Sequence, residues 1–327
     1  MTVPPVQLSH WPTPVQPAPR LAAALGLRPD DLWIKRDDLT DLGGGNKVRK
    51  LEHLVAEAIA AGATVLVASG GAQSNHARTT AAAAARTGLR AVLVLGGTAL
   101  AGQPGNLALD ELLGAEVVLA DGLAGAALDR RVEEVADRLR AAGEVPAVLP
   151  FGGSSAVGAR GYVACAAELE EQVPDAAHVV VAVGSGGTMA GLVAGLGPAR
   201  VLGIDTGAVT DPVRRIAAFV DELAGGPASI RLDRDQVGDG SGRLTSAATA
   251  AMRTAARTEG LLLDPVYTGK ALAGLASAVS EGIVRPGERT VFVHTGGLPG
   301  LYGHPFAAEL AAVAIGRGRR GLTARAQ

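Results

Sequence analysis

The sequence predicts an α/β fold of two open, mostly parallel, twisted sheets flanked by helices. Three observations support this prediction. Short apolar runs rich in valine and leucine alternate along the chain with alanine-rich segments. Such alternation is typical of parallel strands that are covered by helices on both faces. The chain also holds 45 glycines in 327 residues, about twice the ordinary share, and they gather at turns between strands and helices.

The individual elements follow from these patterns. The expected strands are short apolar runs at residues 32–35, 64–70, 91–97, 116–121, 178–184, 200–205 and 290–297. The clearest expected helices are alanine-rich segments at residues 48–62, 75–88, 128–143 and 246–260. These elements form two sets on either side of the loop FGGSSAVGARGY. We therefore predict a large domain of residues 1–52 and 164–327 and a small domain of residues 53–163.

Composition and charge exclude several classes of partner. The formal net charge is −2 and the pI about 6.3, so bulk electrostatics favour neither nucleic acid nor an anionic membrane. The apolar runs are too short to span a bilayer, the first residues lack the pattern of a secretion signal, and the histidines lack the spacing of metal ligands. The single cysteine, Cys165, rules out an intrachain disulfide and fits a reducing compartment. We expect a cytoplasmic protein without a metal ion that acts on a small molecule.

Four glycine-flanked turns follow expected strands. They lie at residues 43–47, 71–76, 184–188 and 296–300, and they combine backbone N–H groups with short hydroxyl or amide side chains. Ligands of open parallel sheets bind at the carboxyl ends of the strands, so we expect these turns to converge. They predict a site for an anionic, polar small molecule.

The turn GSGGT at residues 184–188 leaves three interpretations open. A glycine-rich turn at a helix N-terminus binds phosphate through free N–H groups and the helix dipole. Asp205 follows the next expected strand, roughly where a dinucleotide-binding fold places its ribose-binding acid. Glycine also permits close packing of a helix on a sheet. A motif of this kind does not decide alone between phosphate, dinucleotide and packing.

Lysine is rare in this chain. The 30 basic residues include only four lysines, namely Lys35, Lys47, Lys50 and Lys270. An ε-amine can lose its proton and a guanidinium cannot, so a lysine kept against this bias is expected to be needed as lysine. Lys47 closes the segment GGGNK at an expected helix start, where the helix dipole lowers an amine pKa and favours Schiff-base chemistry. Its neighbours do not fit a P-loop. We interpret Lys50 as a surface or ion-paired lysine.

Six motifs occur in order between residues 12 and 305. They are LWIKRDDLTDLGGGNKVRKLE, GGAQSNHARTTAAAAA, GGSSAVGARGY, VGSGGTMAGL, LLLDPVYTGKALAGL and VFVHTGG. Together they resemble the pyridoxal-phosphate-dependent enzymes of the D-cysteine desulfhydrase and 1-aminocyclopropane-1-carboxylate (ACC) deaminase family. The resemblance implies the type II fold of tryptophan synthase β subunits, a homodimer, and pyridoxal 5′-phosphate held in the large domain.

The resemblance also implies roles for the first two turns. Lys47 would hold the cofactor as an internal aldimine and, once displaced by substrate, act as the base at the substrate Cα. Asn75 would hydrogen-bond the phenolic oxygen of the cofactor. The loop of Ser74, Asn75 and His76 would receive the substrate carboxylate, with Ser74 able to relay a proton.

Three later motifs carry the remaining implied roles. The phosphate would lie on the turn formed by Gly184, Ser185, Gly186, Gly187 and Thr188. Tyr267 of the DPVY motif would lie near the substrate and take part in catalysis. Thr295 would face the pyridine nitrogen, where a neutral hydroxyl leaves that nitrogen unprotonated and favours β-elimination over transamination.

Two positions depart from the family pattern. The Gly-Tyr-Gly turn of the family corresponds to VGDGSGRLTS, where we place Asp239 at the tyrosine position as a substrate-binding residue that repels anionic side chains. ACC deaminases carry glutamate after the DPVY tyrosine as the partner of the pyridine nitrogen, whereas this chain has Thr268. Both departures make ACC a poorer candidate substrate than D-cysteine.

The sequence therefore predicts a lyase or deaminase of a small amino acid, with D-cysteine desulfhydrase-like β-elimination that gives keto acid, ammonia and sulfide. One alternative is ACC deamination. Another is a biosynthetic β-replacement or elimination with an altered substrate pocket. From a different class, a nucleotide-dependent oxidoreductase would use the GSGGT turn to bind its dinucleotide.

Overall fold

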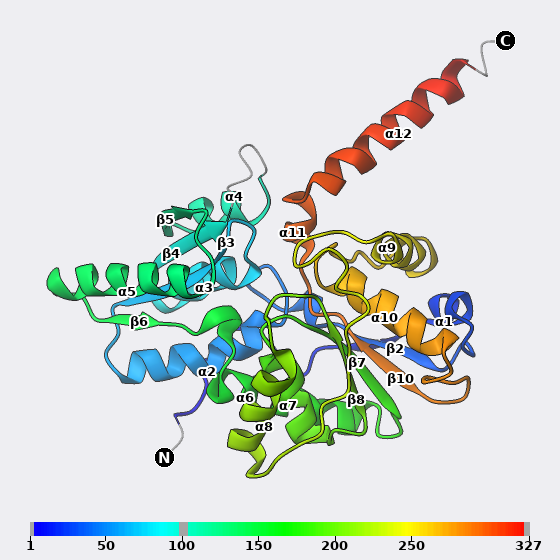
Figure 1. The fold of residues 1–327 in the computed structure, drawn as a ribbon, viewed down its shortest axis with the longest axis horizontal. Helices are drawn as coiled ribbons and strands as arrows, with labels where there is room; N and C mark the ends of the chain where they lie inside the picture. Colours follow the sequence, from blue (N-terminus) through cyan, green and yellow to red (C-terminus); the bar gives the residue numbers. More distant parts are fainter. Residues whose placement is uncertain (1–2, 98–103, 324–327) are drawn as a thin grey trace.

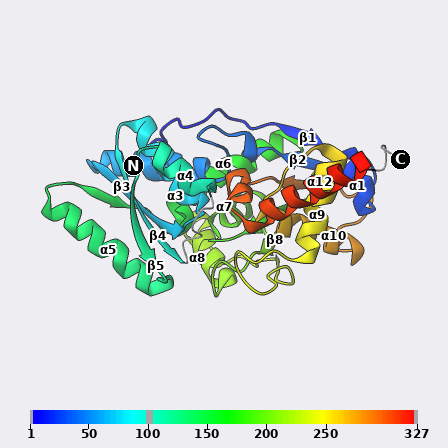
Figure 2. The same ribbon diagram turned by 90° about the horizontal axis from the view of Figure 1, so that it is seen from above.

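The strands of the protein form two sheets that lie side by side along its longest axis (Figures 1 and 2). The computed structural model describes residues 3–97 and 104–323. The larger sheet has the strand order β1-β2-β10-β7-β8-β9 and the smaller has the order β5-β4-β3-β6. The pair β1–β2 is antiparallel and the other pairs are parallel. The predicted fold class is confirmed.

The elements have the following bounds. The larger sheet contains β1 (Val15–Pro17), β2 (Leu32–Lys35), β7 (His178–Val183), β8 (Val201–Asp205), β9 (Leu232–Asp233) and β10 (Thr290–Val293). The smaller sheet contains β3 (Val65–Gly71), β4 (Arg90–Gly97), β5 (Glu116–Asp121) and β6 (Pro146–Val148). The helices are α1 (Pro19–Leu25), α2 (Lys47–Ala60), α3 (Asn75–Thr87), α4 (Gly105–Leu112), α5 (Gly125–Ala141), α6 (Ala156–Gln172), α7 (Gly187–Leu196), α8 (Pro212–Ala224), α9 (Ser246–Glu259), α10 (Thr268–Ser280), α11 (Leu298–Tyr302) and α12 (Pro305–Thr323), with the 3-10 turns η1 (Asp37–Leu39) and η2 (Phe151–Gly153).

Helices cover both faces of the larger sheet (Figure 1). Side chains alternate along a strand, so Val179 and Val181 pack with α6, α7 and α8, whereas Val180 and Ala182 pack with α1, α9 and α10. A strand that is buried on both faces appears in the sequence as an unbroken apolar run. This is why HVVVAV was recognisable as β7.

The smaller sheet is built in the same way. Leu66 and Leu93 pack with α2 and α3, and Val67 and Val94 pack with α5 on the opposite face. Helix α2 belongs to this core through Val48 and its neighbours, although Asn46, just before its first residue, donates to the Thr295 carbonyl after β10 of the larger sheet. In the described part of the chain, no helix is long and apolar enough to cross a membrane.

Some element boundaries differ from the prediction. The expected strand 290–297 ends at Val293, because Gly296 and Gly297 adopt φ angles of +85° and +108° and turn the chain away from the sheet. The strands β1, β6 and β9 were not expected, since each has only two or three residues and depends on its neighbour for hydrogen bonds. The domain boundaries at residues 52/53 and 163/164 stay a prediction, and both fall inside helices.

Candidate active site

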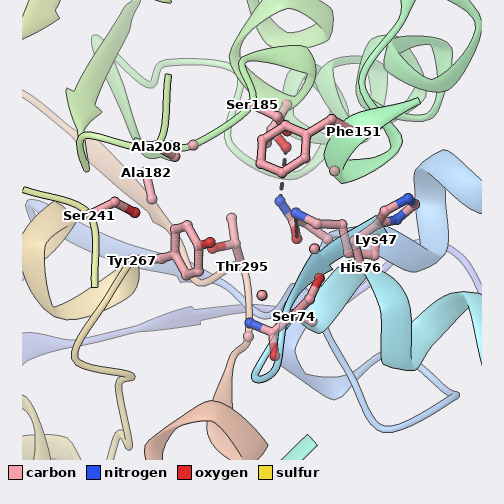
Figure 3. A pocket seen from close by; sticks show the side chains of 18 of the residues that line it. Lys47, Ser74, His76, Phe151, Ala182, Ser185, Ala208, Ser241, Tyr267 and Thr295 are labelled. Carbon is pink, nitrogen blue, oxygen red and sulfur yellow. Dashed lines mark hydrogen bonds between the residues drawn. The ribbon is translucent and has the colours of Figure 1, made fainter. Parts of the chain in front are cut away.

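A cavity of about 300 Å³ opens where strands of both sheets end (Figure 3). It is lined by the start of α2, by η2, by two loops near residues 208 and 241, and by the turns after β3, β7 and β10. Three of the four predicted turns converge here; from the fourth, Gly296 lines the cavity and residues 298–300 do not. Among the described lining residues none is aspartate or glutamate, whereas Lys47 and Lys50 both are included. The site is therefore suited to an anion.

The glycine hinge brings Lys47 to the cavity. Gly43, Gly44 and Gly45 have φ angles of +79°, +79° and +108°, which side chains disfavour. The hinge is tied to the larger sheet because the Gly45 N–H donates to Asp37 and the Asn46 N–H donates to Thr295, both at 3.0 Å. Lys47 is the first residue of α2, and its Nζ donates to Asn46 Oδ1 at 3.1 Å.

The amine of Lys47 is prepared to lose its proton. Burial, together with the nearby positive charge of Arg78, lowers the pKa of Lys47 to about 8, while Asp264 opposes the shift. The low pKa was expected from the helix dipole, but the structure gives burial as the larger cause. A larger fraction of this amine is neutral, and so nucleophilic, at neutral pH than for an exposed lysine.

Lys50 is not the surface or ion-paired lysine that we predicted. Its side chain is 1% exposed, lines the cavity, and donates from Nζ to Ser154 Oγ at 3.0 Å and to the Gly152 carbonyl at 3.4 Å. Burial and the charges of Lys47 and Arg215 hold its pKa well below the ordinary value. Lys47 and Lys50 are three residues apart, which places both on one face of α2. That spacing was the signal available in the sequence.

The GSGGT turn begins α7 and opens onto the cavity. Gly184, Ser185, Gly186 and Thr188 line it, whereas Gly187 does not. The Gly187 N–H donates instead to Ser154 Oγ at 3.1 Å, and that oxygen lies 2.7 Å from Ser185 Oγ. Ser154 and Lys50 are thus part of the turn's surroundings, a contribution that sequence reasoning missed.

Asp205 argues against the dinucleotide interpretation of this turn. It is buried, and its carboxylate accepts from the Gly207 N–H at 2.8 Å and lies 3.4 Å from Arg234 Nε. It is not among the residues that line the cavity. The acid expected to bind a ribose is occupied elsewhere.

The predicted Ser74-Asn75-His76 loop lines the opposite wall. Ser74 caps α3, and its Oγ accepts from the Ala77 N–H at 3.2 Å. Asn75 Oδ1 accepts from Asn106 Nδ2 at 2.8 Å. Burial and the charges of Lys47 and Lys50 lower the pKa of His76 to about 3, so its imidazole is neutral at neutral pH. The loop offers neutral donors next to two lysines.

Two of the three tyrosine and threonine candidates line the cavity. Tyr267 and Thr295 do so, and burial together with Asp264 raises the pKa of Tyr267 to about 12, so its phenol keeps its proton. Thr268 does not line the cavity, because its hydroxyl donates to Asp264 Oδ1 at 2.7 Å and its N–H donates to the same oxygen at 2.8 Å. Of the two neutral hydroxyls, Thr295 alone reaches the site.

Asp239 does not occupy the place that the sequence comparison suggested. Its side chain is exposed, and Ser241 and Gly242 of the same loop line the cavity instead. Lys270 explains the geometry, because its Nζ donates to the Val237 carbonyl at 2.8 Å and the Gly240 carbonyl at 3.1 Å. These bonds hold the loop so that the residues after Gly240 face the site. The motif VGDGSG contains two residues flanked by glycine, Asp239 and Ser241, and it is Ser241 that lines the cavity.

Comparison with known proteins identifies the family of this chain. A family model described as pyridoxal-phosphate dependent enzyme matches residues 6–296. A D-cysteine desulfhydrase of Klebsiella pneumoniae subsp. pneumoniae is 41% identical over 322 residues, which cover 92% of this chain and 97% of that protein. A Pyrococcus abyssi protein provisionally named 1-aminocyclopropane-1-carboxylate deaminase is 39% identical over 316 residues, with 91% and 93% covered.

A solved structure shares the whole fold. The crystal structure of an ACC deaminase homologue superposes with a TM-score of 0.85 at 36% sequence identity, covering 94% of this chain and 96% of that one. The family match spans the glycine hinge, the GSGGT turn and the Ser74–His76 loop. The chain therefore belongs to the pyridoxal-phosphate-dependent enzymes of the type II fold, and pyridoxal 5′-phosphate is its cofactor.

Proposed function

We propose that this enzyme catalyses β-elimination from a small amino acid, in the manner of a D-cysteine desulfhydrase. The Cα proton is removed, the Cβ–S bond breaks with its electron pair leaving on sulfur, and the enamine released hydrolyses to keto acid and ammonia. The main support is the composition of the cavity lining. It contains Lys47, whose pKa is about 8, and residues of the glycine-rich GSGGT turn, but no described carboxylate. The similarity to a D-cysteine desulfhydrase supports the same reaction class.

The residues present fit the cofactor. Lys47 and Lys50 favour an anion because no described residue of the lining is a carboxylate, and the N-terminus of α7 supplies N–H groups and a positive dipole end for the phosphate of the cofactor. We infer that Lys50 and the predicted turn residues hold the phosphate. When bound, pyridoxal phosphate supplies an aldehyde that carries the substrate amino group and a ring that accepts an electron pair from Cα.

Different residues of the chain carry out the separate proton transfers. We infer that Lys47 is the base at Cα, because its amine lines the cavity directly behind the glycine hinge and its pKa is lowered to about 8. Ser74, Asn75 and His76 receive the substrate carboxylate with neutral donors. Ser74 and Tyr267 lie on facing walls (Figure 3), and Tyr267, whose phenol keeps its proton, is positioned to donate it to a leaving group.

The pH dependence of cofactor uptake tests the state of Lys47. Only the neutral amine attacks an aldehyde, and a pKa of about 8 means that the neutral fraction rises about tenfold per pH unit below pH 8 and then levels off. We expect the rate at which cofactor-free protein binds pyridoxal phosphate, followed by visible absorbance, to rise up to about pH 8 and to be flat by about pH 9. A rate that still climbs nearly tenfold between about pH 8 and about pH 9 would indicate an ordinary lysine, whose pKa is about 10.4.

Substrate selectivity tests the proposed reaction. With Thr295 neutral and no described carboxylate in the lining, the pyridine nitrogen has no partner that keeps it protonated, so the ring is a mild electron sink. Elimination of a thiolate needs less withdrawal of electrons than opening a cyclopropane. We expect kcat/KM for D-cysteine to exceed that for ACC at least tenfold, which corresponds to about 1.4 kcal/mol in the barrier.

The assay measures keto acid and ammonia from D- and L-cysteine, other β-substituted alanines, ACC and cysteate on one preparation. D-alanine is the control, because it has no β-leaving group and should give no keto acid. A higher kcat/KM for ACC than for D-cysteine would contradict the proposed β-elimination and would indicate ACC deamination. Because Asp239 lies outside the cavity lining, the sequence-based argument that it repels cysteate has no structural basis.

We further infer that the enzyme is a cytoplasmic homodimer. Helix α12 leaves the body of the molecule (Figure 1), and it exposes 45% of Val313 and 59% of Ile315. Apolar side chains on a projecting helix are expected to be covered by a partner, and a second copy of the chain is the partner that the family resemblance implies. Light scattering of the purified protein measures the mass, and a monomer would contradict the inference.

A further inference from the structure

A fully buried amide lies behind the wall of the cavity. Asn106, near the start of α4, is 0% exposed and contacts Gln73, Asn75 and Arg78. Its N–H donates to Gln73 Oε1 at 2.8 Å, and its Nδ2 donates to the Gln73 carbonyl at 3.0 Å and to Asn75 Oδ1 at 2.8 Å. Its Oδ1 accepts from Arg78 Nε at 3.2 Å. Every polar atom of this side chain is therefore engaged, although Asn106 itself does not line the cavity.

The chemistry of these contacts fixes which way each amide points. Arginine has donors and no acceptor, so Arg78 requires the oxygen of the Asn106 amide to face it. The NH₂ group of Asn106 then faces Asn75 and requires an oxygen there. Asn75 accordingly turns Oδ1 toward the interior, which leaves its own NH₂ group for the cavity that Asn75 lines.

We propose that Asn106 is a positioning residue, which orients the Asn75 amide so that it presents a donor, and not an acceptor, to the phenolic oxygen of the cofactor. The inference rests on the proposed cofactor site. A donor stabilises the ionised phenol, whereas an amide oxygen at the same place would repel it. Arg78 thus fixes the orientation of the Asn106 amide, and the Asn106 amide fixes that of the Asn75 amide at the cavity.

The same arginine also holds the hinge that carries Lys47. Arg78 is 2% exposed; its Nη2 donates to the Gly44 carbonyl at 3.2 Å, and its Nη1 donates to the Leu42 carbonyl. The aldehyde carbon and the phenolic oxygen of pyridoxal phosphate are attached to neighbouring ring atoms. The guanidinium of Arg78 therefore helps to position both protein groups that would contact these two substituents, the Lys47 amine and the Asn75 amide.

The test uses the holoenzyme and the pH titration of its visible absorbance band. In Asn106→Asp the carboxylate still accepts from Arg78 but donates nothing to Asn75, so the Asn75 amide is expected to flip and present its oxygen. We expect the midpoint of the titration to rise by about one pH unit, because the ionised phenol loses its donor. Thr80→Val is the matched control, since Thr80 is a fully buried residue of α3 whose hydroxyl has no hydrogen-bond partner in the described structure; its midpoint should equal that of the wild type.

A double-mutant cycle separates positioning from a direct effect of the new charge. Asn75→Ala alone should raise the midpoint, and adding Asn106→Asp to it should change nothing more, because the amide that Asn106 orients is gone. An equal shift in both backgrounds, or no shift in Asn106→Asp, overturns the proposal. Asn106→Leu is neutral and of similar shape, should shift the midpoint in the same direction, and is compared in the same way if the aspartate variant does not fold.

This test is independent of the proposed reaction. The readout is the spectrum of the bound cofactor without substrate. If borohydride reduction places no pyridoxyl group on Lys47, the cofactor site is wrong. If the group is on Lys47 but the cycle shows no coupling, the inference about Asn106 alone fails.

Discussion

Replacing Lys47 with alanine should reduce turnover by on the order of 10³-fold or more, because the amine that holds the cofactor and the base at Cα are lost together. Lys47→Arg should be equally inactive, since a guanidinium keeps the positive charge but does not give up its proton. Steady-state assays of keto acid formation measure both variants. The pair separates loss of the amine from loss of the charge.

The attachment site is checked directly on the wild-type enzyme. Reduction of the holoenzyme with borohydride, followed by digestion and mass spectrometry, should place the pyridoxyl group on Lys47. Lys50 provides a demanding comparison, because it lies on the same face of α2, lines the same cavity and has a strongly lowered pKa. A pyridoxyl mass on Lys50 would transfer the role of Lys47 to it.

The second large effect is expected at the phosphate turn. Gly186→Asp should weaken cofactor retention on the order of 10³-fold, because two charges about 4 Å apart repel with about 4 kcal/mol at an effective dielectric constant of about 20. Retention is measured as the ratio of bound pyridoxal phosphate to protein after dialysis. Circular dichroism should still show a folded chain.

Gly186→Ala is the control for strain. Gly186 has a φ angle of +94°, and a Cβ there would lie 3.0 Å from Ile216 Cγ1, so alanine and aspartate share the backbone and packing cost. Alanine should lower the melting temperature as much as aspartate does, but should retain far more cofactor. Equal retention by the two variants would mean that the phosphate lies elsewhere.

The sequence allowed the main layers of the fold to be predicted because the strands are buried on both faces. Runs such as HVVVAV need no partner to be recognised, and the helices between them are long and alanine-rich. Strands of two or three residues, such as β1 and β9, carry no such signal. They exist because an adjacent strand offers hydrogen bonds, and that information lies elsewhere in the chain.

The site was predictable where its signal is local. Glycine turns and a scarce lysine identified Lys47 and the GSGGT turn, and all of these residues except Gly187 line the cavity. Lys50 was wrongly predicted to be a surface or ion-paired lysine, because the sequence of a helix does not show which of its faces is covered by other elements. Ser241 was missed for a related reason, since only the bonds from Lys270 decide which residue of VGDGSG turns inward. Asn106 reaches the site only through Asn75.

The ion pairs of Arg49 fix the orientation of helix α2 about its own axis as well as its position. Arg49 is 2% exposed and pairs with Asp37 at 2.9 Å and Glu168 at 2.8 Å, on the side of the larger sheet, while Lys47 and Lys50 face the cavity. One residue inserted between Lys47 and Arg49 would turn the two side chains apart by about 100°. Over evolution, segment 43–50 should therefore tolerate no change of length. New substrate ranges should arise instead by substitution at small wall residues such as Ala208 and Ser241.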